Sequence, residues 1–409
     1  MKKGWQTKHL GDVATVGAGN SAPQDGALFR NGTIPFFRTA DAGRVRFGDL
    51  SEAGDYLNNN GAKGLRRFPP GTILFPKSGA STFLNHRVML GVEGCVSSHL
   101  ATIVADEKQA YPRYLLYFLS SVSAQDLVQD HAYPSLNLPT ISGIEIHLPT
   151  LTEQKRIVGV LDEAFEGIAT AKANAEKNLE NAHAIFESHL QYIFTKRGEG
   201  WAEKTLAELC DPSRIITYGV IKLGDDTPNG VPCLRTSNVR WLRIETAGMK
   251  RIAPSLSSEY SRTILKGGEV LVNVRGTLGG VAVAEPEMAG WNVSREVAMV
   301  PVDPSRINPK FLSYLIGAGA SQNWLGDVKK GAAYVGINLE DLRLLPVCAP
   351  ILSEQLKIVA HLDLLNEEIQ RLASVYERKL AALDALRESL LHQAFSGELL
   401  STSMIEAAE

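Results

Sequence analysis

The sequence lacks several features that would assign it to a class at once. Its four cysteines lie far apart and form no C-x-x-C pair, so we expect buried, unpaired thiols in a reducing cytoplasm. No apolar run is long enough to span a membrane, and no signal peptide is recognisable. The formal net charge is −3, whereas a protein that binds nucleic acid by charge alone is usually basic. Contacts with nucleic acid would therefore have to come from local patches or from a partner.

Motifs of catalysis are also missing. There is no G-x-x-x-x-G-K-[ST] loop for nucleotide phosphates, and no Asn-Pro-Pro-aromatic tetrapeptide of the kind that holds a flipped base. No Asp…Glu-x-Lys cluster resembles a nuclease metal site, the nine histidines are dispersed, and G-A-G-N from Gly17 lacks the dinucleotide-binding spacing. We therefore predict no catalytic residue, no cofactor-binding residue and no metal ligand in this chain, which favours a binding protein over an enzyme.

The most regular stretch of the sequence is Thr152 to Arg197. Its apolar residues recur at the alternating three-and-four spacing of a helix stripe, and no proline interrupts it. Thr152 is the predicted N-cap, and Gly198 is suited to the position after the last turn. A single helix of this length would extend roughly 70 Å at about 1.5 Å per residue. The sequence therefore predicts a long strut rather than a helix wrapped within a domain.

This stretch occurs twice. The opening T-E-Q-K-R-I-V-G-V-L-D recurs as S-E-Q-L-K-I-V-A-H-L-D, so a second helix is predicted from Ser353 to Phe395. We predict that a seam along the two helices packs them against each other or against partners. Its predicted members are Ile157, Leu161, Ile168, Leu190, Ile358, Leu362, Leu365, Ile369, Leu372, Leu383, Leu386 and Leu390.

The repeat extends beyond the helices into the segments that precede them. G-W-Q-T-K-H-L matches G-W-A-E-K-T-L, I-P-F-F-R-T-A matches V-P-C-L-R-T-S, and G-T-I-L-F matches G-E-V-L-V, always in the same order. Short β-rich runs between glycine-rich turns predict mixed modules with a modest sheet and one or two short helices. We predict an α+β fold with two such modules in pseudo-two-fold arrangement, separated by two long antiparallel coiled-coil helices. The predicted divisions are 1–151, 152–199, 200–350 and 351–409.

Polar and basic residues in the glycine-rich loops are the candidates for DNA contact. Lys77 and Arg275 directly follow apolar strands, where a loop can approach a groove closely, and arginine is the commonest reader of guanine. Each of these residues could equally be a surface charge or a group that stabilises a turn. The full candidate set is Arg38, Thr39, Lys77, Ser78, His131, Tyr133, Arg235, Thr236, Asn238, Arg240, Arg275, Thr277, Lys329, Lys330 and Tyr334.

The duplicated order also carries a family resemblance. Each module is followed by a P-x-L-[TS]-E-Q helix start, P-T-L-T-E-Q from Pro149 and P-I-L-S-E-Q from Pro350. With the I/V-P-x-x-R-T, G-x-[IV]-L and Y-x-x-x-N segments, the chain resembles the specificity subunit of type I restriction–modification enzymes over nearly all its length. The first helix, with Gly159 and Gly167, is less regular than the second.

That resemblance implies a function divided among several chains. The modules would be target recognition domains 1 and 2, each reading one half of a split sequence in double-stranded DNA. The long helices would set the gap and dock two methyltransferase (modification) subunits, to which restriction subunits can be added. S-adenosylmethionine, ATP and Mg²⁺ would belong to those partners, with no cofactor in this chain.

Two other readings stay open at this point. A coiled-coil scaffold could assemble partners without reading DNA directly, and an enzyme could carry a site that no motif reveals. A DNA-binding assay with the methyltransferase partner separates the first from DNA recognition. Methyl transfer by this chain alone would support the second. The target bases themselves are not predictable from these residues.

Overall fold

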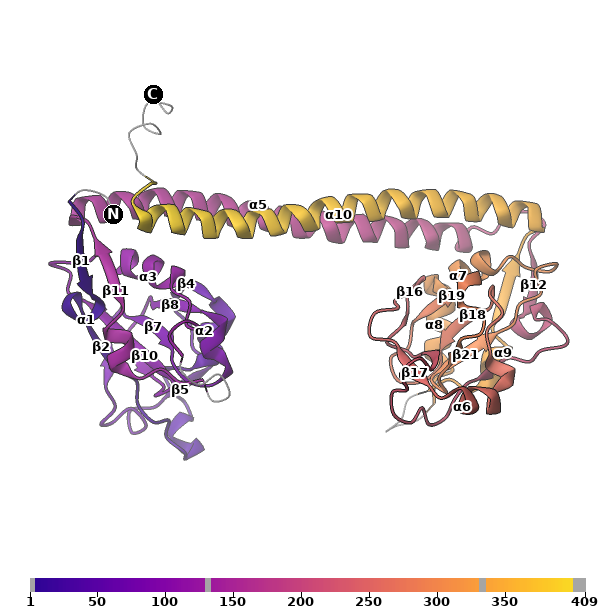
Figure 1. The fold of residues 1–409 in the computed structure, drawn as a ribbon, viewed down its shortest axis with the longest axis horizontal. Coiled ribbons are helices and arrows are strands. Elements are labelled where there is room, and N and C mark those ends of the chain that lie inside the picture. The colour runs from indigo at the N-terminus through magenta and orange to yellow at the C-terminus, as the bar shows by residue number, and fades with distance from the viewer. Residues whose placement is uncertain (1–3, 129–133, 331–335, 400–409) are drawn as a thin grey trace, which may run out of the picture. The chain divides into compact units, whose positions relative to one another are not determined.

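The computed structural model describes residues 4–128, 134–330 and 336–399. The chain divides into two compact units, Met1–Ala175 with Arg378–Glu409 (unit 1) and Glu176–Glu377 (unit 2). Each unit holds one globular module, the first part of one long helix and the last part of the other. This division differs from the predicted boundaries, which set both helices apart from the modules. The long helices are α5 (Leu151–Thr195) and α10 (Leu352–Ser396), each continuous over 45 residues (Figure 1).

The module of unit 1 contains two mixed sheets and an antiparallel strand pair. The pair joins β1 (Gln6–His9) to β11 (Glu145–Leu148). One sheet has the order β2 (Ala14–Ala18), β10 (Leu100–Ala105), β7 (Ile73–Pro76), β8 (Arg87–Leu90), β4 (Phe47–Leu50). The other has the order β5 (Asp55–Leu57), β3 (Ile34–Phe37), β9 (Gly94–Val96), β6 (Arg67–Phe68). The helices are α1 (Leu10–Val13), α2 (Thr39–Val45), α3 (Pro112–Ser121) and α4 (Leu138–Ser142), with 3-10 turns η1 (Gly26–Phe29) and η2 (Ala80–Leu84).

The module of unit 2 repeats this plan with fewer strands in its two sheets. The strand pair is β12 (Ala202–Thr205) with β22 (Pro346–Ala349). One sheet has the order β13 (Thr217–Tyr218), β21 (Val297–Val300), β18 (Val270–Asn273), β19 (Val281–Val283). The other has the order β17 (Lys250–Ile252), β14 (Val231–Leu234), β20 (Asn292–Val293). A hairpin of β15 (Val239–Arg240) and β16 (Arg243–Ile244) has no counterpart among the described elements of unit 1. The helices are α6 (Pro254–Glu259), α7 (Pro309–Gly317), α8 (Gly319–Asp327) and α9 (Leu339–Arg343), with 3-10 turns η3 (Leu206–Leu209), η4 (Ser261–Thr263) and η5 (Pro286–Met288).

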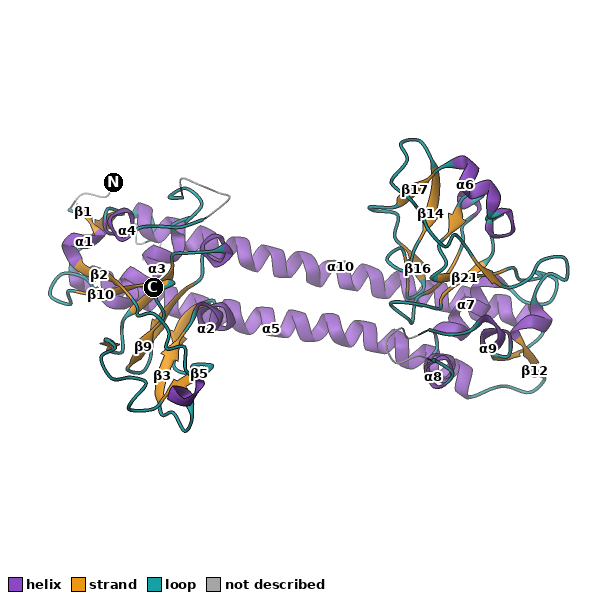
Figure 2. Ribbon diagram, turned by 90° about the horizontal axis from the view of Figure 1, so that it is seen from below, coloured by secondary structure: helices purple, strands orange, loops and turns teal. Residues whose placement is uncertain are grey.

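These elements confirm the predicted α+β class and the duplication. The strands predicted from G-T-I-L-F and G-E-V-L-V are β7 and β18, at equivalent places in their sheets. Short strands joined by long loops make up both modules, as Figure 2 shows. The helix ends differ from the prediction. Thr150, rather than Thr152, precedes α5 and accepts from the Glu153 amide at 3.3 Å. Gly397 has the left-handed backbone (φ +85°) suited to a helix end, whereas α5 stops at Thr195, before Gly198.

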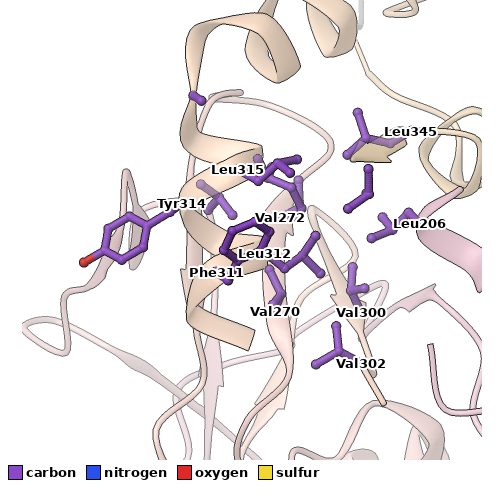
Figure 3. Packing of buried hydrophobic residues seen from close by; sticks show 14 of the residues in the cluster. Leu206, Val270, Val272, Val300, Val302, Phe311, Leu312, Tyr314, Leu315 and Leu345 are labelled. Atoms are coloured by element: carbon purple, nitrogen blue, oxygen red, sulfur yellow. The ribbon is translucent and has the colours of Figure 1, made fainter. Parts of the chain in front are cut away.

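The core of unit 2 lies between α7 and the sheet. Phe311, Leu312 and Leu315 of α7 point toward Val270 and Val272 of β18, as Figure 3 shows, and all five are buried. Helix α7 starts with a proline at its first turn, and Asn308 caps it by accepting from the Phe311 amide at 3.0 Å. The amphipathic sequence of α7 thus supplies the face that covers the sheet. In unit 1, α3 takes the same role over β8 and β10.

The repeated glutamine in both T/S-E-Q helix starts attaches each long helix to its own module. Gln154 is fully buried, donates to the carbonyls of Pro149 (2.9 Å) and Gln109 (3.0 Å), and accepts from the Tyr111 amide (2.7 Å). Gln355 likewise donates to Pro350 (2.8 Å) and accepts from Asn308 (2.8 Å). Each buried amide is therefore hydrogen-bonded, as burial requires. The repeat at this position reflects helix–module attachment.

The repeated aspartates also attach the long helices to the modules, about two turns further along each helix. Asp162 accepts from the Tyr117 hydroxyl and from Arg113 Nε, the latter at 3.1 Å. Asp363 accepts from the Tyr314 hydroxyl at 2.7 Å and from Lys310 Nζ at 3.0 Å. In both units a basic residue and a tyrosine four positions apart on the short helix hold the carboxylate, because residues at i and i+4 share a helix face.

Within each unit the parts of the two long helices run antiparallel. In unit 1 Lys172 Nζ binds Asp384 at 2.7 Å, and the Arg387 guanidinium lies 5.2 Å from the centre of the Phe165 ring. In unit 2 the Nε2 atoms of His189 and His361 are 2.9 Å apart. In unit 1 the earlier α5 residue, Phe165, lies beside the later α10 residue, Arg387. The later α5 residue, Lys172, binds the earlier α10 residue, Asp384, so the two helices run in opposite directions.

Two members of the predicted seam are exposed, which corrects the prediction for the interior of the helix pair. Leu372 and Leu386 are 39% and 47% exposed. The buried face runs instead through Ile369 and Ala373, which are one turn apart, so Leu372 lies to the side. Near Leu386 the inward position belongs to Arg387, whose guanidinium lies 3.8 Å from the centre of the Phe47 ring. The other ten are buried or half-buried: Ile157, Leu161, Ile168, Leu190, Ile358, Leu362, Leu365, Ile369, Leu383 and Leu390.

Candidate nucleic-acid interface

In unit 2 the structure brings the candidates Arg275 and Thr277 close to the candidates Lys329 and Lys330, which come from a later part of the sequence. Arg275 follows β18, its guanidinium lies 5.5 Å from the centre of the Tyr218 ring, and its backbone pairs with Gly336. The backbones of Lys330 and Gly336 exchange two hydrogen bonds, of 2.9 and 3.0 Å. The turn that carries Arg275 and the exposed Thr277 therefore lies beside the segment that carries Lys329 and Lys330. Lys329 is exposed, and Lys330 Nζ binds Asp341 at 2.9 Å.

The residues after β14 have more structural roles than predicted. Asn238 is 1% exposed, accepts from the Arg235 amide at 3.1 Å and donates to the Glu245 carbonyl at 2.9 Å. Its amide therefore stabilises a turn, and the prediction that it contacts DNA is wrong because the side chain is buried and already engaged. Arg235 is half-buried and donates to the Gly248 carbonyl at 3.3 Å, while the exposed Arg240 pairs with Glu245 at 3.2 Å.

In unit 1 the equivalent positions are occupied differently. Arg38 Nε pairs with Asp55 at 2.5 Å, and its guanidinium lies 5.1 Å from the centre of the Phe36 ring. Thr39 is the first residue of α2 and is half-buried. The Arg38 guanidinium is therefore paired within the module, although 40% of its side chain is exposed.

The strand-end turn of unit 1 carries the other candidates. Ser78 Oγ and His99 Nδ1 lie 2.9 Å apart, and Lys77 is half-buried. The Leu136 amide donates to the Lys77 carbonyl at 2.8 Å, so this turn is fixed beside the segment that follows residue 133. His131, Tyr133 and Tyr334 lie outside the described residues. Sequence reasoning missed two neighbours of the candidates, namely His99, beside Ser78, and Tyr218, beside Arg275. The run V-S-S-H-L-A from Val96, which is repeated as V-S-R-E-V-A from Val293, could have drawn attention to His99, but no local pattern marks Tyr218.

Backbone hydrogen bonds align the two turns as the matched runs G-T-I-L-F and G-E-V-L-V do, which places the two basic candidates, Lys77 and Arg275, one position apart. The Lys77 amide donates to the His99 carbonyl at 3.0 Å, and the Val274 amide donates to the Glu296 carbonyl at 2.9 Å. Lys77 is thus equivalent to Val274, and Ser78 is equivalent to Arg275. The modules present different side chains on the same backbone frame, as two readers of different sequences would require.

The shifted pKa values in the described residues include those of surface carboxylates such as Glu245, whose pKa is lowered by hydrogen bonds from Arg243 and Arg240, and those of buried groups in the cores. Burial raises the pKa of Tyr117 to about 12, with the bond to Asp162 adding to the shift. Burial also raises the pKa values of Cys210 and Cys233 to about 12, so both thiols stay protonated at neutral pH and are poor nucleophiles. All four cysteines are buried and unpaired, which confirms the expectation for them.

The described residues contain no group of three or more histidine, cysteine, aspartate or glutamate side chains placed to hold a metal ion. None of the described helices has the length and apolar character needed to cross a membrane.

A family model supplies the class of the protein. The model of the type I restriction modification DNA specificity domain matches residues 2–181 and again 198–374. The chain therefore belongs to this family and carries two copies of its domain. Members of this class are non-catalytic components that recognise DNA. This finding favours DNA recognition over the scaffold reading.

Individual relatives agree with this assignment. The chain is 23% identical over 362 residues to the type I restriction enzyme EcoBI specificity subunit of Escherichia coli, covering 81% of this chain and 76% of that one. It is 20% identical to the EcoKI specificity subunit of Escherichia coli K12, covering 98% and 90%. A crystal structure of the HsdS subunit from Thermoanaerobacter tengcongensis shares the fold, with a TM-score of 0.55, 20% identity and 98% coverage of both chains. A chain from a study of type I R-M complex assembly superimposes with a TM-score of 0.75 at 20% identity, covering 98% of this chain and 99% of that one.

Proposed function

We propose that this chain reads a bipartite DNA sequence for a type I restriction–modification complex, with one half-site for each module. The observation that carries the proposal is the duplication of one backbone frame with different side chains at the strand-end turns, Lys77–Ser78 in one copy and Val274–Arg275 in the other. Direct reading of bases depends on such side chains, whereas phosphate contacts fix the position on the duplex.

The proposed recognition domains are residues 1–151 and 200–350, and the helical segments 152–199 and 351–409 are proposed to dock two methyltransferase subunits. The exposed apolar side chains of Leu372 and Leu386 fit contact with a partner better than the interior of a helix pair. Restriction subunits could be added to that complex. S-adenosylmethionine, ATP and Mg²⁺ are placed in the partner chains, and the complex is placed in the cytoplasm, where the cell's DNA would be its substrate.

The proposal is tested by methyl transfer from S-adenosylmethionine to DNA. The chain is assembled with the methyltransferase subunit from the same source, and the modified sites are mapped. We expect modification at one split sequence by the complex and none by either component alone. Methylation by this chain alone, or modification by the complex without sequence preference, would contradict the proposal.

Arg275 provides a test at a single residue. Arg275→Ala should weaken discrimination at one half-site by about 1–3 kcal/mol, the value of a bidentate contact with guanine. Ser78→Ala, at the equivalent position of the other module, should affect only the other half-site. Binding of the complex to DNAs that vary one half at a time measures both. Equal weakening on all sequences would instead assign Arg275 to a phosphate contact.

A further inference from the structure

Asn273 is a buried polar residue placed beneath the loops of the module in unit 2. It ends β18 and is 2% exposed. Its Nδ2 lies 3.0 Å from the carbonyl oxygen of Val239 and 3.1 Å from that of Thr277, with the Thr236 carbonyl at 3.4 Å. The two amide hydrogens can therefore bind both of the nearer carbonyls. One side chain joins the segment after β14 to the turn after β18.

Glycine is needed for this junction to close. A Cβ atom added to Gly280 would lie 2.3 Å from Asn273 Nδ2 and 2.3 Å from the Val239 carbonyl oxygen. The same turn contains Gly276 and Gly279 with left-handed backbones (φ +68° and +91°). Such a turn has wide conformational freedom of its own, so its geometry depends on what holds it. The Asn273 side chain is the buried group that does so.

The segments that Asn273 joins carry most of the candidate DNA contacts of this module. Thr236 lies on one segment, and Thr277 and Arg275 lie on the other. The backbone pairing of Arg275 with Gly336, and of Gly336 with Lys330, extends the connection to a third segment. A shift of Asn273 would therefore move residues of all three segments relative to one another.

The other module achieves its arrangement without an equivalent amide. The sheet register pairs Asn273 with Val297 and Pro76 with Leu100, so Pro76 is the counterpart, and it has no side-chain donor. Asn273 Oδ1 is buried and has no hydrogen-bond partner in the described parts of the chain. An unsatisfied buried carbonyl is unfavourable, so stability alone does not account for an asparagine here.

We propose that Asn273 is a positioning residue that sets the geometry of the recognition loops in unit 2, and thereby determines which bases are read at one half-site. Asn273 is not proposed to contact DNA. This inference rests on the proposed function, and it adds the residue through which Thr236, Thr277 and Arg275 are held in register.

The test uses the complete chain in complex with its methyltransferase subunits. Asn273→Ala removes both donors, and Asn273→Asp keeps the shape but turns acceptors toward carbonyl oxygens. We expect a loss of roughly 10- to 100-fold in discrimination among sequences at one half-site, the range of a good base contact. Discrimination at the other half-site should be unchanged.

Leu271→Ala is the matched control for stability. Leu271 lies two residues earlier on the same strand and is fully buried in the apolar cluster that also contains the Val239 side chain, but it takes no part in the loop hydrogen bonds. If Leu271→Ala and an Asn273 variant lower the thermal unfolding midpoint by the same amount, only the Asn273 variant should lose discrimination among DNA sequences at that half-site. Equal relaxation in Leu271→Ala, unchanged specificity in Asn273→Ala, or losses at both half-sites would overturn the inference. A wild-type complex without bipartite specificity would refute the proposed function itself, so the two failures are distinguishable.

Discussion

Phe395→Ala should lower the free energy of unfolding of unit 1 by about 3–5 kcal/mol, the usual cost of deleting a buried aromatic side chain. Phe395 lies near the end of α10, is 9% exposed, and meets Tyr114 and Phe118 of α3 edge to face, with ring centres 5.3 and 5.5 Å apart. These contacts attach the last turns of α10 to the module, because Leu391 and Ala394 beside it are also buried. The substitution would leave a cavity between two helices.

The duplication supplies an internal comparison for this variant. Phe194 of α5 meets Phe311 of α7 in unit 2 with ring centres 5.4 Å apart, the same joint in the other copy. Hydrogen exchange followed by mass spectrometry should therefore show faster exchange in α3 and β11 of Phe395→Ala, and unchanged exchange in α7. Leu386→Ala, at an exposed site on the same helix, should change stability by about 0.5 kcal/mol or less. Faster exchange in both units alike would show that the joint does not act locally.

Local patterns predicted the long helices, but the contacts that explain their repeated residues were not predictable. Spacing of apolar residues and the absence of proline identify α5 and α10, because both signals depend only on neighbours in sequence. The repeated glutamine and aspartate were visible in the sequence as well. Their partners are Tyr111, Arg113 and Tyr117 in unit 1, which lie some 40 to 50 residues away from Gln154 and Asp162. Such pairings depend on the assembled module.

At the candidate DNA-contact residues, too, local signals predicted the turns but not the tertiary contacts of the side chains. Strand-end position correctly located Arg275 and Thr277 in a turn, since a glycine after an apolar strand is a local signal. The same reasoning could not tell that Arg38 pairs with Asp55, or that Asn238 is buried and donates to the Glu245 carbonyl. Asn273 was overlooked because its place at the end of an apolar run resembles any strand terminus. Whether a polar side chain faces solvent or holds a turn is decided by tertiary packing.

Arg87→Met should raise the free energy of unfolding of unit 1 by about 1–4 kcal/mol, by analogy with buried ion pairs, whose replacement by apolar residues of similar volume often stabilises proteins by that amount. Arg87 of β8 is fully buried, and its guanidinium lies 3.4 Å from the centre of the Phe75 ring. It donates to the carbonyls of His86 (2.9 Å) and Val122 (3.4 Å), and its Nε has no partner among the described residues. Burial lowers the pKa of Arg87 to about 9, which reflects how unfavourable the charged form is there.

The opposing contributions can be weighed against each other. Val122 follows the last turn of α3, where a positive charge is favourable by about 0.3–1 kcal/mol, and two charge-assisted hydrogen bonds add about 1.5–3 kcal/mol each at best. The bond to Val122 is long, however, and removal of a cation from water costs several kcal/mol. The sheet register makes Val281 of β19 the equivalent residue in unit 2, where it is fully buried. The other copy of the module therefore folds with an apolar side chain at the position that Arg87 occupies in unit 1.

A second substitution separates loss of charge from loss of volume. Arg87→Ala also removes the charge but leaves a cavity beside Phe75, so it should destabilise unit 1 by about 2–5 kcal/mol, as other large-to-alanine changes in cores do. Chemical unfolding of the two variants and the wild type, followed by a probe in unit 1, should rank them Met, wild type, Ala in decreasing stability. If Met and Ala were equally destabilising, the guanidinium would be a net stabilising group, and its bonds to His86 and Val122 would outweigh the cost of its burial.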